Sequence, residues 1–264
     1  MASLTMAFAE RSELGRRPNN EDAVFATPRL LAIADGVGGA AAGEVASQIV
    51  IQEMMSLEKR RLVRPLPDEL RSAVTAANQT LAFLTTCRPH LEGMASTLTA
   101  VALANDGSYL IANVGDSRAY LFRDHALRQL TRDESLVQAL IDTGALTSEQ
   151  ARSHPQRSVV LNSLDGAHRL ELELSCHRSK PGDRLLLCSD GLSDVVADAA
   201  IAAILEEPSR DRAADSLVEA ALQAGGADNV SVVVADVVRT RDPMAGWLDT
   251  LPPPSARRSG VAGG

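Results

Sequence analysis

The feature that most constrains this chain is an apolar run that ends abruptly in a carboxylate and a glycine-rich turn. Residues 30–34 are all apolar, and Asp35-Gly36 follows directly, with two more glycines by residue 39. A short apolar run bounded by turn residues predicts a buried strand, and glycines let the backbone approach a ligand closely. Residues 184–191 repeat the pattern, with an apolar run that ends at Asp190-Gly191. We therefore expect two buried strands, each of which delivers an aspartate to a turn.

The composition indicates a globular protein with an acidic balance. Of the 264 residues, 45% are hydrophobic and 23% are charged, which excludes disorder over most of the length. Only 3% are aromatic, so the core must be built from Ala, Val, Leu and Ile. The formal net charge of -8 argues against non-specific nucleic-acid binding, because that requires a basic face. An acidic balance also suits a cluster of carboxylates that binds metal.

The three cysteines, Cys87, Cys176 and Cys188, are widely spaced and lack the paired spacing of a zinc site. Reduced thiols are the simplest interpretation. No apolar run reaches the roughly 18 to 20 residues that span a bilayer, and the N-terminus lacks a basic region followed by an apolar signal core. We expect a cytoplasmic protein that does not contact a membrane.

The order of elements predicts one layered domain over residues 1–240. Helical periodicity covers residues 43–58, a segment after Pro65 that includes residues 70–84, and residues 198–205 and 209–224. Short connections favour antiparallel strands, which we expect at 23–26, 30–34, 97–104, 108–114, 118–123, 170–174, 184–189 and 230–238. Residues 131–166 form an irregular insertion with a capping box at Thr147 and Gln150. Residues 241–264 are rich in Pro, Gly and Ser and are expected to be a flexible tail.

Five acidic residues lie where strands meet turns: Glu21, Asp35, Asp116, Asp190 and Asp228. Two carboxylates about 4 Å apart repel each other by on the order of 4 kcal/mol at an effective dielectric of 20. A divalent cation offsets that repulsion, and an all-oxygen ligand set selects Mg²⁺ or Mn²⁺ over zinc. Each junction alone is also compatible with an ordinary turn or helix cap. Five such junctions in one chain favour a metal centre.

Two adjacent divalent ions are a suitable site for hydrolysing phosphate esters, since they activate a water and neutralise the phosphoryl oxygens. An arginine would complete such a site, because its guanidinium can bind a phosphate through two parallel hydrogen bonds. Arg17, four residues before Glu21, is the candidate. The sequence therefore predicts a phosphate-ester hydrolase centred on the acidic junctions.

The residues that carry this prediction resemble the PP2C (PPM) family of metal-dependent serine/threonine phosphatases, particularly its bacterial branch. The resemblance covers residues 5–238 and rests on five motifs in the family's order: Arg17-Pro18-Asn19-Asn20-Glu21-Asp22, Asp35-Gly36-Val37-Gly38-Gly39, Gly115-Asp116-Ser117-Arg118, Ser189-Asp190-Gly191-Leu192 and Asp228-Asn229. It implies an α+β fold, a four-layer α-β-β-α sandwich with two central antiparallel sheets flanked by helix pairs. The insertion at 131–166 would be the flap that varies between members.

The resemblance also implies a role for each matching position. Asp35 would bridge two Mn²⁺ or Mg²⁺ ions, the carbonyl of Gly36 would ligate one of them, and Asp190 and Asp228 would bind the other. Asp116 would bind a third ion together with Asp190. Glu21 would orient the attacking water and Arg17 would bind the substrate phosphate, while Asn229 would support Asp228. The implied reaction is hydrolysis of phosphoserine or phosphothreonine in proteins without a covalent intermediate.

Three departures from the family pattern affect details. Val37 stands where animal members carry a histidine proposed as general acid, so the leaving group would be protonated by water or by another group. Asp133-Glu134-Ser135 replaces the Asp-His-Ser of many bacterial relatives, and Ala95-Ser96 replaces Gly-Thr before Thr97. None of these changes touches a predicted ligand, so we expect activity to be retained.

The expected partners are phosphorylated proteins, either the substrates of a serine/threonine kinase or that kinase itself, and the expected state is a monomer. Two alternatives stay open. One is a catalytically weak module that binds a phosphorylated partner, and the other is a dedicated regulator that acts on a phosphorylated anti-sigma-factor antagonist.

Overall fold

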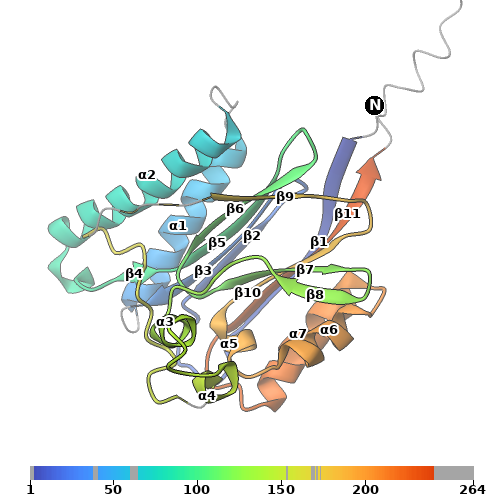
Figure 1. Cartoon of the computed structure of the whole chain (residues 1–264). Coiled ribbons are helices and arrows are strands. Elements are labelled where there is room, and N and C mark those ends of the chain that lie inside the picture. Colours follow the sequence, from blue (N-terminus) through green and yellow to red (C-terminus); the bar gives the residue numbers. More distant parts are fainter. Residues whose placement is uncertain are drawn as a thin grey trace, which may run out of the picture.

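The computed structural model describes residues 3–37, 41–59, 65–152, 154–167, 170, 172 and 174–240 (Figure 1). The predicted tail at 241–264 and the glycines at 38 and 39 lie outside these residues. No helix in the described part of the chain is both long enough and apolar enough to cross a membrane.

Two antiparallel sheets form the centre of the fold. The first has the order β1 (Ser3–Glu13), β11 (Val230–Thr240), β10 (Arg184–Cys188), β7 (Arg118–Arg123) and β8 (Ala126–Gln129). The second has the order β2 (Asp22–Ala26), β3 (Leu30–Val37), β5 (Leu98–Leu103), β6 (Ser108–Val114) and β9 (Leu174–Arg178). The two-residue strand β4 (Ala95–Ser96) pairs with the end of β3.

Helices cover the outer face of each sheet. Helices α1 (Ala41–Lys59) and α2 (Leu66–Cys87) lie on one side of the paired sheets, and α6 (Asp198–Leu205) and α7 (Arg210–Gln223) lie on the other (Figure 1). Buried apolar residues form three clusters, one under each helix pair and one between the sheets. The predicted four-layer α-β-β-α sandwich is therefore confirmed.

Strand β3 shows why the apolar run at 30–34 does not alternate with polar residues. Leu30, Ala32 and Ala34 belong to the cluster under α1 and α2, whereas Leu31 and Ile33 belong to the cluster between the sheets. A strand buried on both faces requires apolar residues at every position. The run ends at Asp35 because there the strand leaves the core.

Between β8 and β9 the chain forms the expected irregular insertion, with the short helices α3 (Leu136–Asp142) and α4 (Ser148–Arg152). The capping box is present, since the amide of Thr147 donates to Oε1 of Gln150 and the amide of Gln150 donates to Oγ1 of Thr147. Two further short helices, η1 (Pro89–Leu91) and α5 (Asp190–Ser193), are not evident from the sequence pattern.

The strand predicted at residues 170–174 is misplaced, because β9 begins only at Leu174. Leu170 and Leu172 lie outside any strand and pack against the cluster under α1 and α2. The other two residues of the predicted strand, 171 and 173, lie outside the described residues.

Candidate metal centre

The two sheets bring the predicted carboxylates to one end of the fold. Asp35 lies near the end of β3, Asp190 begins α5 directly after β10, Asp116 lies in the turn between β6 and β7, and Asp228 precedes β11. Burial raises the pKa of Asp35 well above its usual range, and the charges of Asp22, Asp190, Asp116 and Asp228 raise it further. These carboxylates are therefore close enough to repel one another electrostatically.

Asp190, which follows a strand of the other sheet, lies near the same carboxylates. Burial raises the pKa of Asp190 well above its usual range, and the next causes are the charges of Asp116, Asp194 and Asp228. Burial likewise raises the pKa of Asp116 to about 6, and the charges of Asp133 and Asp194 add to the effect. The structure thus brings Asp35, Asp116, Asp190 and Asp228 to one acidic site.

Asp22 is a member of this site to which sequence reasoning assigned no role. It stands opposite Asp35 in the register of β2 and β3, and its pKa is raised to about 6, mainly by burial. One carboxylate oxygen, Oδ2, accepts a hydrogen bond of 2.8 Å from the hydroxyl of Ser189. The other, Oδ1, is buried without a hydrogen-bond partner among the described residues. The available signal was its position directly before the strand predicted at 23–26, whose neighbour in the chain is the strand that ends at Asp35.

Asp194 was also missed. Burial raises its pKa, while the charges of Arg118 and Arg157 lower it. It lies four residues after Asp190, a spacing that places two side chains on the same side of a helical turn. That spacing was visible in the sequence, but only the structure shows that residues 190–193 are helical.

Arg17 and Glu21 lie beside the carboxylates, as the sequence predicts. The guanidinium of Arg17 donates to Oδ2 of Asp228 over 2.7 Å, and about half of the Arg17 side chain is exposed. Burial raises the pKa of Glu21, the charge of Arg17 lowers it, and the charges of Asp228 and Glu44 raise it. An exposed cation next to a half-exposed carboxylate can exchange that partner for an anionic ligand.

Asn229 ties the segment that carries Arg17 and Glu21 to the rest of the site. Its side-chain amide donates to the carbonyls of Leu14 and Asn19, each over 2.9 Å, and its Oδ1 accepts from the amide of Glu21 over 2.8 Å. These three bonds hold the segment that carries Arg17 and Glu21 against Asn229.

Gly36 lies where no side chain fits. A Cβ atom there would stand 2.1 Å from the carbonyl oxygen of Gly43 and 2.8 Å from that of Glu21. The amide of Gly36 donates to the carbonyl of Glu21 over 3.1 Å. The start of α1 therefore packs directly on the end of β3, and this contact requires glycine.

The donor set of this site fits a divalent ion that prefers oxygen. Its members are carboxylates whose ionised forms are disfavoured by burial and by one another, with one buried carboxylate oxygen of Asp22 unpaired among the described residues. No three His, Cys, Asp or Glu side chains in the described ranges already stand as a set that could hold an ion. The fit therefore lies in the chemistry of the donors.

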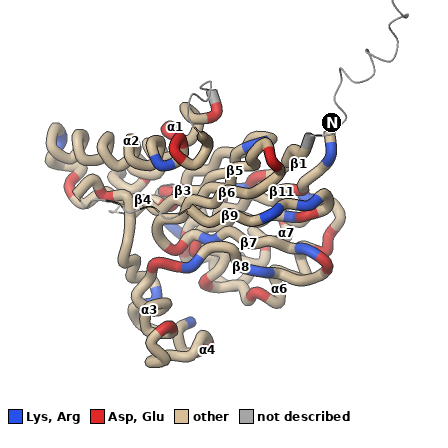
Figure 2. The backbone as a smooth tube through the Cα atoms, turned by 45° about the horizontal axis from the view of Figure 1, so that its top comes forward, with Lys and Arg blue, Asp and Glu red and all other residues tan. Residues whose placement is uncertain are grey.

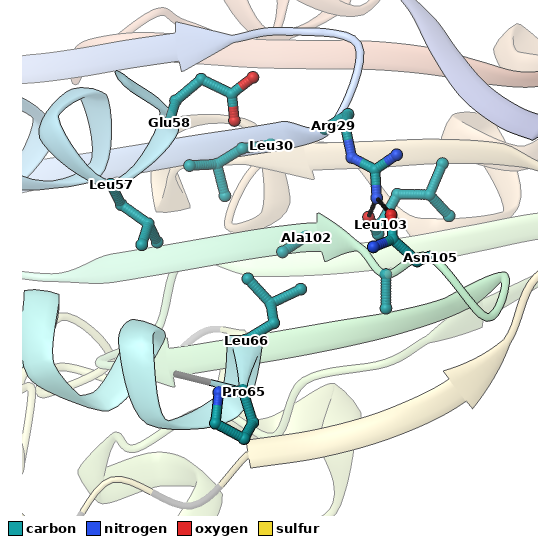
Figure 3. Close-up of a pocket in the computed structure, with 10 residues that line it drawn as sticks. Arg29, Leu30, Leu57, Glu58, Pro65, Leu66, Ala102, Leu103 and Asn105 are labelled. Atoms are coloured by element: carbon teal, nitrogen blue, oxygen red, sulfur yellow. Dashed lines mark hydrogen bonds between the residues drawn. The ribbon is translucent and has the colours of Figure 1, made fainter. Parts of the chain in front are cut away.

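A separate cavity of about 440 Å³ lies between the end of α1, the start of α2, the start of β3 and the end of β5 (Figure 3). It is lined by Leu30, at the start of β3, whereas Asp35 lies near the end of that strand. Within it, Arg29 donates to the carbonyl of Leu103 and to Oδ1 of Asn105. This cavity is not part of the acidic site.

In the view of Figure 2, basic and acidic residues are interspersed along the described chain. The formal net charge of -8 disfavours attraction to a phosphate backbone.

Comparison with known proteins identifies the family. The family model for protein phosphatase 2C matches residues 11–229. The serine/threonine protein phosphatase PstP of Mycobacterium tuberculosis is 46% identical over 269 residues, which cover 97% of this chain and 52% of that protein. The serine/threonine phosphatase stp of Listeria monocytogenes is 34% identical over 237 residues, or 86% of this chain and 94% of that protein. The chain thus spans about half the length of the mycobacterial relatives it matches.

Solved structures agree with the fold. A crystal structure of the M. tuberculosis phosphatase PstP/Ppp is 47% identical, covers 89% of this chain and 99% of that chain, and has a TM-score of 0.85. The catalytic domain of PstP in complex with 2 manganese ions is 46% identical, covers 89% of this chain and 100% of that chain, and has a TM-score of 0.84. The fold is thus shared with the catalytic domain of PstP. This chain belongs to the protein phosphatase 2C family.

Proposed function

We propose that this chain is a metal-dependent phosphoprotein phosphatase that hydrolyses phosphoserine and phosphothreonine by direct attack of water. The observation that carries the proposal is the convergence of four buried or half-buried aspartates from both sheets, next to an exposed arginine. Family membership and the manganese complex of PstP support it. When bound, two Mn²⁺ or Mg²⁺ ions supply an activated water and neutralise charge on the phosphoryl oxygens.

The residues of the site have distinct proposed tasks. Asp35 would bridge the two ions, with the carbonyl of Gly36 on one and Asp190 and Asp228 on the other. Asp116 would bind a third ion. The backbone amide of Asn229 donates to Oδ1 of Asp228 over 2.8 Å, which supports its proposed part in holding Asp228 in place.

Arg17 would bind the phosphate of the substrate. Its guanidinium already pairs with a carboxylate at 2.7 Å and is half exposed, so a dianionic phosphate can take that place when Asp228 ligates metal. Glu21 would accept a hydrogen bond from the attacking water and so orient it. Val37, whose side chain is exposed, carries no acid, and the leaving alkoxide would take its proton from solvent.

We also propose a domain spanning residues 1–240 with a flap at 131–166 and a flexible tail at 241–264. The substrates would be phosphorylated proteins, among them the kinase that opposes this phosphatase. We further propose a monomeric protein of the cytoplasm, where its three free cysteines would stay reduced.

The decisive experiment measures release of phosphate from a phosphothreonine peptide. We expect turnover only with added Mn²⁺ or Mg²⁺, and a loss of more than about 10³-fold in kcat for Asp35→Asn and for Asp190→Asn. Full activity in EDTA would overturn the proposal. Tight binding of the phosphopeptide without turnover at millimolar Mn²⁺ would instead identify a phosphoprotein-binding module.

A further inference from the structure

Glu134 is a residue of the flap base that the proposed function does not use. Its side chain is half-buried. Its carboxylate oxygen Oε2 accepts a hydrogen bond of 2.9 Å from the amide of Gly115. Its own amide donates to the carbonyl of Gly115, also over 2.9 Å. Both polar backbone groups of Gly115 are therefore bound by one residue of the flap.

The other side of Gly115 packs closely against Thr97. It has a φ of +100°, and a Cβ atom there would stand 2.6 Å and 2.8 Å from the Cγ2 and Cβ atoms of Thr97. The carbonyl of Gly115 belongs to the same peptide plane as the amide of Asp116. That carbonyl accepts from the backbone amide of Glu134 and from the side-chain amide of Asn113, whereas the carboxylate of Glu134 binds the Gly115 amide, one peptide earlier. The Glu134 side chain therefore holds the N-terminal side of the glycine from which the backbone runs on to Asp116.

Thr97 likewise binds the backbone of Asp35 through two hydrogen bonds. The amide of Asp35 donates to Oγ1 of Thr97 over 3.0 Å, and the amide of Thr97 donates to the carbonyl of Asp35 over 2.8 Å. The hydroxyls of Thr97 and Ser117 are hydrogen-bonded over 3.0 Å, and both residues are buried. Thr97 thus links the backbone of Asp35 to the side chain of Ser117, the residue after Asp116, whereas Glu134 links the residue before Asp116 to the flap.

The returning end of the flap reaches the same place. The amide of Leu161 donates to the carbonyl of Glu134 over 2.7 Å. Three residues later, Leu164 and Ser96 exchange two backbone hydrogen bonds of 2.8 Å and 3.0 Å, and Ser96 stands opposite Gly36 in the pairing of β3 and β4. Both ends of the flap are therefore bonded to backbone next to predicted metal ligands.

We propose that Glu134 is a positioning residue through which the flap holds the carboxylate of Asp116 in place for metal binding. This inference rests on the proposed role of Asp116 as a metal ligand. A bond that only stabilised the fold would leave metal affinity unchanged once the protein is folded. A positioning bond changes metal affinity, because partners that orient a ligand typically contribute 10–100-fold to metal binding.

The test is a calorimetric titration of the metal-free full chain with Mn²⁺, without substrate. We expect Asp116→Asn to weaken the binding of one Mn²⁺ ion, and Glu134→Ala to weaken the binding of the same ion by roughly ten-fold or more. Glu134→Gln keeps a side-chain oxygen that can accept from the Gly115 amide, so it should restore binding to within about three-fold of the unchanged protein. If Glu134→Ala does not fold, Glu134→Asp gives the same comparison, because its shorter side chain no longer reaches that amide.

Asp142→Ala is the matched control, because it removes a flap carboxylate that binds Arg132 and Gln138 and does not contact Gly115. Its Mn²⁺ affinities should equal those of the unchanged protein. In metal-free protein, deuterium exchange of the Gly115 amide should accelerate in Glu134→Ala and not in the control.

Two results would overturn the proposal. One is unchanged Mn²⁺ affinity in Glu134→Ala, even if the Gly115 amide exchanges faster. The other is equal weakening by Asp142→Ala. Neither result depends on turnover, so a chain that binds Mn²⁺ but does not hydrolyse phosphothreonine would refute the proposed function and leave this test intact.

Discussion

Asp183 is the residue whose removal we expect to destabilise the fold most clearly without touching the acidic site. It lies just before β10, and only 1% of its surface is exposed. Its carboxylate accepts from the hydroxyl of Tyr109 at 2.6 Å, from Nε and Nη2 of Arg123 at 2.5 Å and 2.6 Å, and from the amide of Lys180 at 2.7 Å. Asp183→Ala removes all four acceptor contacts at once.

The magnitude follows from what the substitution leaves behind. The side chain of Tyr109 is fully buried, and an unsatisfied buried hydroxyl costs about 1–3 kcal/mol. Arg123 is only 24% exposed, and removing one partner of a buried ion pair typically destabilises by about 3–5 kcal/mol. The two effects share one carboxylate and are not additive. We expect a loss of about 3–5 kcal/mol in the free energy of unfolding.

The effect should depend on pH in a defined direction. Burial raises the pKa of Asp183, but the hydrogen bonds from Arg123 and Tyr109 and the amide of Lys180 outweigh it, so the pKa is lowered overall. A carboxylate with a lowered folded-state pKa contributes stability above its unfolded pKa of about 3.9 and loses it as the pH falls. The difference between the unchanged protein and Asp183→Ala should therefore be full at neutral pH and shrink below about pH 4.

The assay is urea unfolding of the metal-free proteins at pH 7 and at lower pH. Asp211→Ala is the control, because Asp211 is exposed and stands 3.7 Å from Arg11; its change should stay within about 0.5 kcal/mol. A loss below about 1 kcal/mol for Asp183→Ala would refute the reasoning, since a buried, four-fold bonded carboxylate would then carry no net stability.

Three further outcomes follow from the acidic site. Gly36→Ala should lower the free energy of unfolding by about 1–3 kcal/mol, because the new Cβ meets the backbone of Gly43; an unchanged Tm in a thermal scan would contradict the close approach. Mn²⁺ at 100 times its Kd should raise the free energy of unfolding by about 2.7 kcal/mol and thereby raise Tm. If Mn²⁺ raises the Tm of Asp35→Asn as much as that of the unchanged protein, Asp35 is excluded as a ligand. Arg17→Lys should raise KM for a phosphopeptide by about ten-fold or more, because lysine cannot form two parallel hydrogen bonds to phosphate, and steady-state kinetics with an unchanged KM would refute phosphate binding by Arg17.

Local sequence patterns were sufficient wherever burial alone decides the structure. The apolar runs before Asp35 and Asp190 predicted strands that are buried on both faces, and the capping box at Thr147 and Gln150 is present as expected. The same logic failed at residues 170–174, because Leu170 and Leu172 pack against the cluster under α1 and α2 without belonging to a strand. Burial periodicity reports which side of the chain faces the core, and it does not report which strand, if any, lies alongside.

The sequence by itself determined the residue types of the acidic site and the turns that carry them, since each turn is encoded within a few positions. Only the tertiary structure decided which carboxylates meet. It set Asp22 opposite Asp35, paired Arg17 with an aspartate 211 positions away, and bonded Glu134 to the glycine before Asp116. These contacts depend on strand order and on the packing of two sheets, and such long-range choices are made by the whole core rather than by any local pattern.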